Sequence, residues 1–103
     1  MKILNAFSVN MLSGLPALVE FTEVSLSEAA KLARSAESAI GHADTAAVFS
    51  TVLGVPLSTN RATVTLQKGD EALVGQYRGP RLPEGSTTLP DDATIQWIVV
   101  SVA

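Results

Sequence analysis

The side chain best suited to chemistry in this sequence is its single histidine, His42. An imidazole has an ordinary pKa of about 6.5, so it can hold or release a proton near neutral pH. Gly41 comes directly before it and allows a tight turn, and a helix is predicted to follow. A solitary histidine is more often structural or merely exposed, so its role depends on the other polar residues of the chain.

Two further polar clusters lie at the ends of apolar segments. Asn5, Ser8 and Asn10 follow the opening apolar run, where such residues also serve to cap or turn the chain. Arg81 and Glu84 lie in a loop rich in glycine and proline, where an arginine is usually just a solvated charge. The predicted helix start after the histidine favours an anion, because its free amides and dipole point there. A phosphate is therefore one ligand that these groups could hold.

Composition excludes several classes of chemistry. The chain has no cysteine, which rules out disulfides, thiolate nucleophiles and thiolate metal sites. One histidine cannot form a familiar zinc centre, and the carboxylates lack calcium-loop spacing. We therefore expect no metal and no cofactor. The formal net charge of −3 argues against a non-specific binder of long nucleic acid, but allows a small anionic ligand held by a few arginines.

Length and hydropathy predict one compact domain over residues 1–103. The chain is 47% hydrophobic and only 17% charged, which suggests more apolar surface than a monomer needs. A symmetric homodimer would bury that surface. Residues 1–7 are too short and polar for a signal peptide, and no apolar run approaches about 18 residues. We therefore expect a soluble, intracellular protein with no membrane partner.

The apolar pattern predicts an α+β fold with a mixed sheet of about five strands and two flanking helices. Ser25 and Glu28 match a capping box that opens the first helix, and Gly54 would end the second. That second helix should begin at Asp44 and carry an apolar stripe of Ala47, Val48, Thr51 and Val52. We predict strands over residues 3–7, 17–24, 61–67, 71–77 and 94–102, a short element over 38–40, and a mobile loop over 79–92. Residues 61–67 and 71–77 should pair as a hairpin, and the last strand should lie inside the sheet.

These clusters, taken in order, resemble a known family. The match covers five collinear segments spread over most of the chain: 4–12 (LNAFSVNML), 38–42 (SAIGH), 60–61 (NR), 69–71 (GDE) and 81–85 (RLPEG). Together they look like the viral ring nucleases that act as type III anti-CRISPR proteins. Several relatives carry a longer, charged helical insert before the final strand, whereas only residues 86–92 intervene here.

The resemblance implies a metal-independent phosphodiesterase. Such proteins are symmetric dimers that bind cyclic tetra-adenylate across the two-fold axis and cut it to linear di-adenylates, which suppresses type III CRISPR immunity. His42, Arg81 and Glu84 match the family's catalytic positions. Its ligand-contacting positions correspond to Asn5, Ser8, Asn10, Arg61 and Gln76.

Elementary chemistry agrees with those roles. An RNA phosphodiester contains its own nucleophile, the 2′-hydroxyl, so the protein needs to align it, shield phosphate charge and protonate the leaving oxygen. His42 would supply that proton, Arg81 would neutralise developing phosphoryl charge, and Glu84 would orient His42 and favour its charged form. Gln76 could read an adenine edge, and the 79–92 loop would close over the ligand.

Two other functions remain open at this stage. The protein could sequester the cyclic nucleotide without cutting it, because the ligand contacts would be nearly the same. It could also be a regulatory protein that uses its apolar surface to contact a viral or host partner, although that leaves the joint presence of His42, Arg81 and Glu84 unexplained. The acidic composition with few lysines suggests a mesophilic source, and we expect a phage- or prophage-encoded protein of the host cytoplasm.

Overall fold

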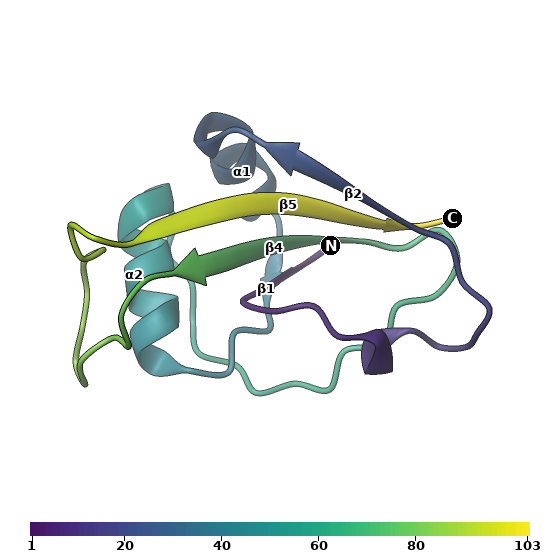
Figure 1. The fold of residues 1–103 in the computed structure, drawn as a ribbon, viewed down its shortest axis with the longest axis horizontal. Helices are drawn as coiled ribbons and strands as arrows, with labels where there is room; N and C mark the ends of the chain where they lie inside the picture. The colour runs from purple at the N-terminus through teal and green to yellow at the C-terminus, as the bar shows by residue number, and fades with distance from the viewer.

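A computed structural model describes all residues from Met1 to Ala103. Its centre is a five-stranded mixed sheet in the order β2-β5-β4-β1-β3 (Figure 1). The predicted α+β class, the number of strands and the two helices are confirmed. The elements are β1 (Lys2–Leu4), a 3₁₀ turn (Val9–Met11), β2 (Val19–Val24), α1 (Leu26–Ala33), β3 (Glu37–Ser38), α2 (Ala43–Leu53), β4 (Glu71–Arg78) and β5 (Thr94–Val102).

The two longest strands form the middle of the sheet. β4 and β5 pair antiparallel along their whole length, from Glu71↔Ser101 to Arg78↔Thr94. β2 adds antiparallel to the other edge of β5, whereas β1 runs parallel to both β4 and β3. The prediction that the last strand lies inside the sheet is confirmed, and its near-continuous apolar sequence follows from burial on both faces.

Each face of the sheet has its own apolar cluster. Alternate residues of the strands point to opposite faces, so Leu73 and Trp97 meet the helices while Val74 and Val100 face the other way. On the helical side, Phe49 of α2 packs edge to face on Trp97, with ring centroids 5.1 Å apart. The opposite side is partly covered by irregular segments that contribute Phe7, Met11, Leu12, Val64 and Leu66.

The helix ends follow the predicted signals. The Ser25 side chain accepts a hydrogen bond from the Glu28 backbone N–H at 3.1 Å, which caps α1. Gly54 ends α2 in the left-handed conformation with φ 68°, where a glycine has no steric penalty. The predicted apolar stripe of α2 is partly wrong, since Thr51 is exposed and the buried residues are Ala46, Val48, Phe49 and Leu53.

The predicted strand over residues 61–67 is wrong, and so is its hairpin with residues 71–77. Both edges of β4 are already occupied by β5 and β1, so no edge is free to pair with it. The segment instead runs alongside the N-terminal loop, with one isolated bridge between Leu12 and Leu66. Its alternation is still used, because Val64 and Leu66 face the core while Thr63 and Thr65 stay exposed.

The end of the first strand differs by several residues from the sequence prediction. The first strand ends at Leu4 rather than at residue 7, since Asn5 begins a bend. The turn at Gly69 and Asp70 is present, closed by the Asp70 N–H on the Gln67 carbonyl at 2.9 Å. Neither helix has the length and apolar character needed to cross a lipid bilayer.

Candidate functional site

A polar cleft of about 940 Å³ lies where α2 begins and the loop after β4 turns back. We call it the His42 cleft. The residues of chemical interest that line it are His42, Asp44, Thr45, Tyr77, Arg81 and Glu84. The structure thus brings together the three residues that the sequence nominated as catalytic, although about forty positions separate His42 from Arg81 and Glu84.

His42 is held at the start of α2 by the backbone around it. It is the N-cap residue with extended backbone dihedrals, and its exposed side chain makes no capping hydrogen bond, so the imidazole is free to face the cleft. Arg61 steadies the preceding residue, because its Nε donates to the Gly41 carbonyl at 3.1 Å. Its side chain also lies over Gly41, where an added Cβ would come within 3.2 Å of the Arg61 Cγ.

Arg61 therefore has a different observed role from the one expected. The sequence placed it among the ligand contacts, and it lines neither the His42 cleft nor the cleft beside it. Its observed contact is with the backbone that leads into His42. The two terminal nitrogens of its guanidinium make no hydrogen bond within the chain and remain available to an anion.

The loop that supplies Arg81 and Glu84 is fixed at several points although it has no regular secondary structure. Tyr77 Oη donates to the Pro80 carbonyl at 2.6 Å, and Thr51 Oγ1 donates to the Thr87 carbonyl at 2.6 Å. Between these points, the Gly85 N–H donates to Asp44 Oδ1 at 2.9 Å. The predicted mobile loop is thus attached to α2 through side chains of the helix.

The charges of the His42 cleft are mixed. Arg81 and the histidine can be cationic, whereas Asp44 and Glu84 are acidic. No hydrogen bond or ion pair joins His42 to Glu84, and the single ion pair of the chain lies elsewhere, between Lys2 Nζ and Glu37 Oε2 at 2.8 Å. The contact by which Glu84 would orient His42 is thus not made in this arrangement, and that role stays a prediction.

A second cleft, of about 500 Å³, adjoins the first on the sheet face opposite the helices. Thr45 and Tyr77 line both clefts, so the two lie side by side, and together we call them the depression. We call this second part the Phe21 cleft. Asn5 and Gln76, two of the predicted ligand-contacting residues, line it together with Phe7 and Phe21. The two phenylalanine rings meet edge to face at 5.5 Å, and Phe21 is 56% exposed.

Ser8 and Asn10 do not join this depression. Ser8 caps the 3₁₀ turn, where its hydroxyl accepts from the Asn10 backbone N–H at 3.3 Å. Both residues are exposed and line neither cleft. Ser8 therefore has the capping role that the sequence left open, whereas Asn10 contributes its backbone N–H, and the ligand contacts of both residues remain a prediction.

The sequence prediction does not include three polar residues of the depression: Asp44, Thr45 and Tyr77. Asp44 indicates only the start of a helix in the sequence, and Thr45 follows it in the same first turn. Both residues are close to His42 in sequence, and residues in the first turn of a helix surround the same helix end. This closeness could have indicated that they belong to the site. Tyr77 had no such signal, because its position depends on the pairing of β4 with β5.

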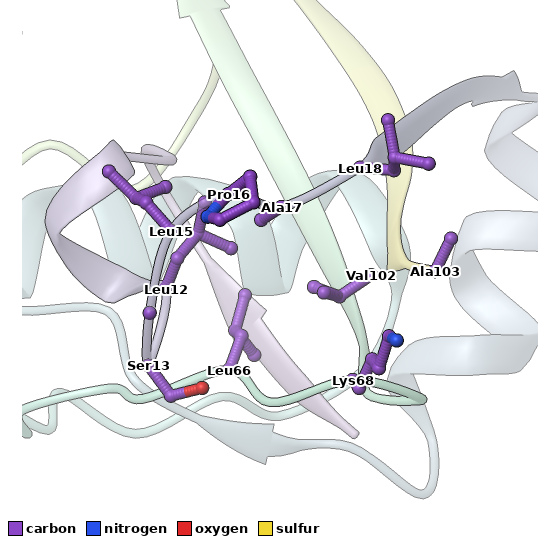
Figure 2. Close-up of a pocket in the computed structure, with 11 residues that line it drawn as sticks. Leu12, Ser13, Leu15, Pro16, Ala17, Leu18, Leu66, Lys68, Val102 and Ala103 are labelled. Atoms are coloured by element: carbon purple, nitrogen blue, oxygen red, sulfur yellow. The ribbon is translucent and has the colours of Figure 1, made fainter.

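A third hollow, of about 640 Å³, lies at the far end of β5 (Figure 2). We call it the Leu15 hollow. Figure 2 shows that the loop before β2, the segment before β4 and the C-terminus surround it, and its lining includes Leu12, Leu15, Leu18, Leu66, Lys68 and Val102. It contains one ionisable side chain, Lys68, and none of the residues nominated from the sequence. No cluster of three or more histidine or acidic residues suited to a metal ion occurs in the chain.

The fold and its cleft define a small α+β protein whose mixed sheet has helices on one face and a polar depression at one end. The sequence matches the profile of the STIV B116-like family over residues 1–97, and the chain belongs to that family. Among solved structures it is similar to B116 of Sulfolobus turreted icosahedral virus, with a TM-score of 0.82 and 28% sequence identity over 97% of each chain. No curated protein matches the sequence. The chain is thus related to a viral protein.

Proposed function

We propose that this protein is a metal-independent ring nuclease that cleaves cyclic tetra-adenylate to linear di-adenylates and thereby suppresses type III CRISPR immunity. One observation supports the proposal above all. His42, Arg81 and Glu84, which come from two segments far apart in the chain, line one cleft. That cleft adjoins a second one with Asn5, Gln76 and exposed aromatic surface, which suits a nucleotide with both phosphate and base.

The proposed reaction is an internal transfer at phosphorus. The 2′-hydroxyl of one ribose gives its proton to solvent water as its oxygen attacks the adjacent phosphorus, the bond to the 5′-oxygen of the next nucleotide breaks, and a 2′,3′-cyclic phosphate forms. The imidazolium of His42 gives its proton to the departing 5′-oxygen, which contributes on the order of a hundred- to ten-thousand-fold in rate. The Arg81 guanidinium offsets the negative charge that builds on the phosphoryl oxygens.

The remaining residues bind and align the ring. Arg61 holds the Gly41 carbonyl with Nε and has two terminal nitrogens left for a phosphate. Asn5 and Gln76 can hydrogen-bond an adenine edge or a ribose, and the apolar lining of the Phe21 cleft covers the base. Amide hydrogens at the start of α2 add to the positive potential around the phosphate.

The proposed active unit is a homodimer. A ring of four equivalent nucleotides has the two-fold symmetry of a pair of identical subunits, so two copies of His42 can cut opposite linkages. Exposed apolar residues beside the cleft, above all Phe21, offer a surface for the second subunit. Ser8 and Asn10, which lie outside the clefts of one chain, would contact the ligand only if the second copy brings it to them.

The decisive experiment follows the cleavage of cyclic tetra-adenylate by metal-free protein in EDTA, with separation of the products. We expect conversion to linear di-adenylates that end in a 2′,3′-cyclic phosphate. Loss of activity on chelation, with recovery on adding a divalent cation, would show that the metal-free mechanism is wrong. An intact ring after prolonged incubation would show that the protein is not a ring nuclease.

A second function, sequestration without hydrolysis, is favoured by one observation. His42 forms no hydrogen bond or ion pair with either Glu84 or Arg81, so a single chain offers binding groups without a joined acid–base pair. A single-turnover assay with protein in excess separates the two functions. Linear product supports cleavage, whereas ring that is bound and fully recovered on denaturation supports sequestration.

A further inference from the structure

The polar groups of the His42 cleft come from two parts of the chain, and their relative position must be fixed for them to act on one ligand. His42 precedes α2, whereas Arg81 and Glu84 lie in the loop between β4 and β5. Two side-chain hydrogen bonds join that loop to α2, and only one of them reaches the stretch that contains Arg81 and Glu84. It is the bond from the Gly85 N–H to Asp44 Oδ1, at 2.9 Å.

The two partners of this bond lie next to the candidate catalytic groups. Asp44 is the second residue of α2, two positions after His42. Gly85 directly follows Glu84 and has φ 82°, a left-handed conformation that suits glycine. The Ser86 N–H donates to the Pro83 carbonyl at 3.1 Å, so Gly85 lies within a closed turn. A bond to a carboxylate at this point therefore fixes the tip of the loop against the start of the helix.

We propose that Asp44 is a positioning residue that sets the placement of Arg81 and Glu84 relative to His42. The proposal rests on the proposed function for its kinetic consequence, while the hydrogen bond itself can be measured without any activity. Placement matters because an error of about 1 Å in the reacting geometry can cost on the order of a hundredfold in rate.

The charge of Asp44 gives a second reason to assign it this role. A carboxylate beside a phosphate repels it, so an acidic residue in this cleft weakens ligand binding. The same carboxylate accepts the hydrogen bond from Gly85 that holds the loop, and this contact offsets the loss of ligand binding. The effect of the acceptor oxygen can be measured apart from the effect of the charge, because Asp44→Asn keeps a carbonyl oxygen and removes the negative charge.

The kinetic test compares Asp44→Ala and Asp44→Asn with the unmodified dimer on cyclic tetra-adenylate. We expect kcat to fall at least tenfold in Asp44→Ala, and to stay within about threefold in Asp44→Asn with a lower KM. Thr51→Val is the matched control, because it removes the other loop-to-helix bond, Thr51 Oγ1 to the Thr87 carbonyl, and should change kcat less than threefold. Equal losses in all three variants, or an unchanged Asp44→Ala, would overturn the proposal.

A double-mutant cycle separates positioning from general destabilisation. In an Arg81→Ala background, Asp44→Ala should reduce the rate by a clearly smaller factor than it does in the unmodified protein, since one of the two groups that it positions is gone. If Asp44→Ala lowers the cleavage rate by the same factor with and without Arg81, the proposal is wrong.

Amide hydrogen exchange at Gly85 gives a readout without activity. The Gly85 amide should exchange at least tenfold faster in Asp44→Ala than in the unmodified protein, and it should remain protected in Asp44→Asn. Unaltered exchange in Asp44→Ala would show that Asp44 does not hold the loop, even if the ring is cleaved. Faster exchange in a protein that leaves the ring intact would support the attachment of the loop and count against the ring-nuclease function alone.

Discussion

The two ends of the β4–β5 pair carry very different surfaces. At the Arg78–Thr94 end, the start of α2 and the loop after β4 form the polar His42 cleft. This cleft has two acidic residues, an arginine and the histidine. At the other end, the chain forms the Leu15 hollow, where Leu15 and Leu18 are 70% and 76% exposed and Lys68 is the one ionisable side chain. Figure 1 shows the two ends at opposite sides of the molecule.

The segments at each end of the sheet determine where charged side chains gather, because the same two strands run through both ends. The polar end combines a helix start with a loop that is attached by side-chain hydrogen bonds, so ionisable groups are held in place. At the apolar end, a single ionisable side chain, Lys68, lines the hollow. The following variants test this contrast, beginning with the largest expected effect.

The largest effect is expected from His42→Ala. Loss of the proton donor should lower the rate of ring cleavage at least a hundredfold, the lower end of what general acid catalysis supplies. Lys68→Ala, at the apolar end, is the control and should leave the rate within twofold. Initial rates of cleavage are measured at saturating cyclic tetra-adenylate. An unchanged rate in His42→Ala would show that His42 is not the proton donor.

The next effect concerns the packing under the polar end. A Cβ at Gly75 would lie 2.5 Å from ring atoms of both Phe49 and Trp97, so Gly75→Ala must displace an aromatic ring. We expect a loss of about 1–3 kcal/mol in the free energy of unfolding. Gly14→Ala at the apolar end meets no atom within 4 Å and serves as the control. Thermal unfolding measures both, and equal melting temperatures would contradict the packing argument.

A smaller effect distinguishes the two apolar surfaces as subunit contacts. Because the proposed ligand crosses the two-fold axis beside the His42 cleft, the dimer should bury Phe21 rather than Leu18. Phe21→Ser should weaken dimerisation at least tenfold, since each buried phenylalanine contributes on the order of 1.5–3 kcal/mol. Leu18→Ser should leave the dimer constant within twofold. Sedimentation equilibrium of the two variants decides between the surfaces, and the reverse pattern would place the contact at the Leu15 hollow.

The smallest effect comes from the edge pair Lys2–Glu37, which lies away from both ends. The hydrogen bond and the charge of Lys2 hold the pKa of Glu37 below its ordinary value. A lowered pKa in the folded state stabilises the protein above the unfolded pKa, and that contribution is lost as the pH falls through the lowered value. Glu37→Gln should therefore reduce the melting temperature slightly at pH 7 and leave it unchanged at pH 2. If the melting temperature of Glu37→Gln falls by the same amount at both pH values, the ion pair is not the cause.

Local sequence signals predicted the helix ends and the inside position of the last strand. Ser25 caps α1 and Gly54 ends α2 because these residue types satisfy backbone groups through contacts a few residues away. The long apolar run of β5 required burial on both faces wherever the strand was placed. His42 at the start of a helix followed from the same short-range reasoning.

Strand pairing could not be obtained in this way. Residues 61–67 have the alternation of a strand, yet β5 and β1 occupy both edges of β4, so the predicted hairpin partner offers no free edge. The outcome depended on competition among distant segments, which alternation within one segment does not describe.

The sequence by itself determined the candidate groups of the site and the class of the fold, because residue types and short-range periodicity are local properties. Tertiary structure decided that His42, Arg81 and Glu84 share a cleft, that Tyr77 and Asp44 belong with them, and that Ser8 and Asn10 lie apart. The shared cleft involves the pairing of β4 with β5 and long-range bonds such as the one from the Gly85 N–H to Asp44 Oδ1, which joins residues 41 positions apart. Contacts over such a separation are fixed by the packing of the whole chain.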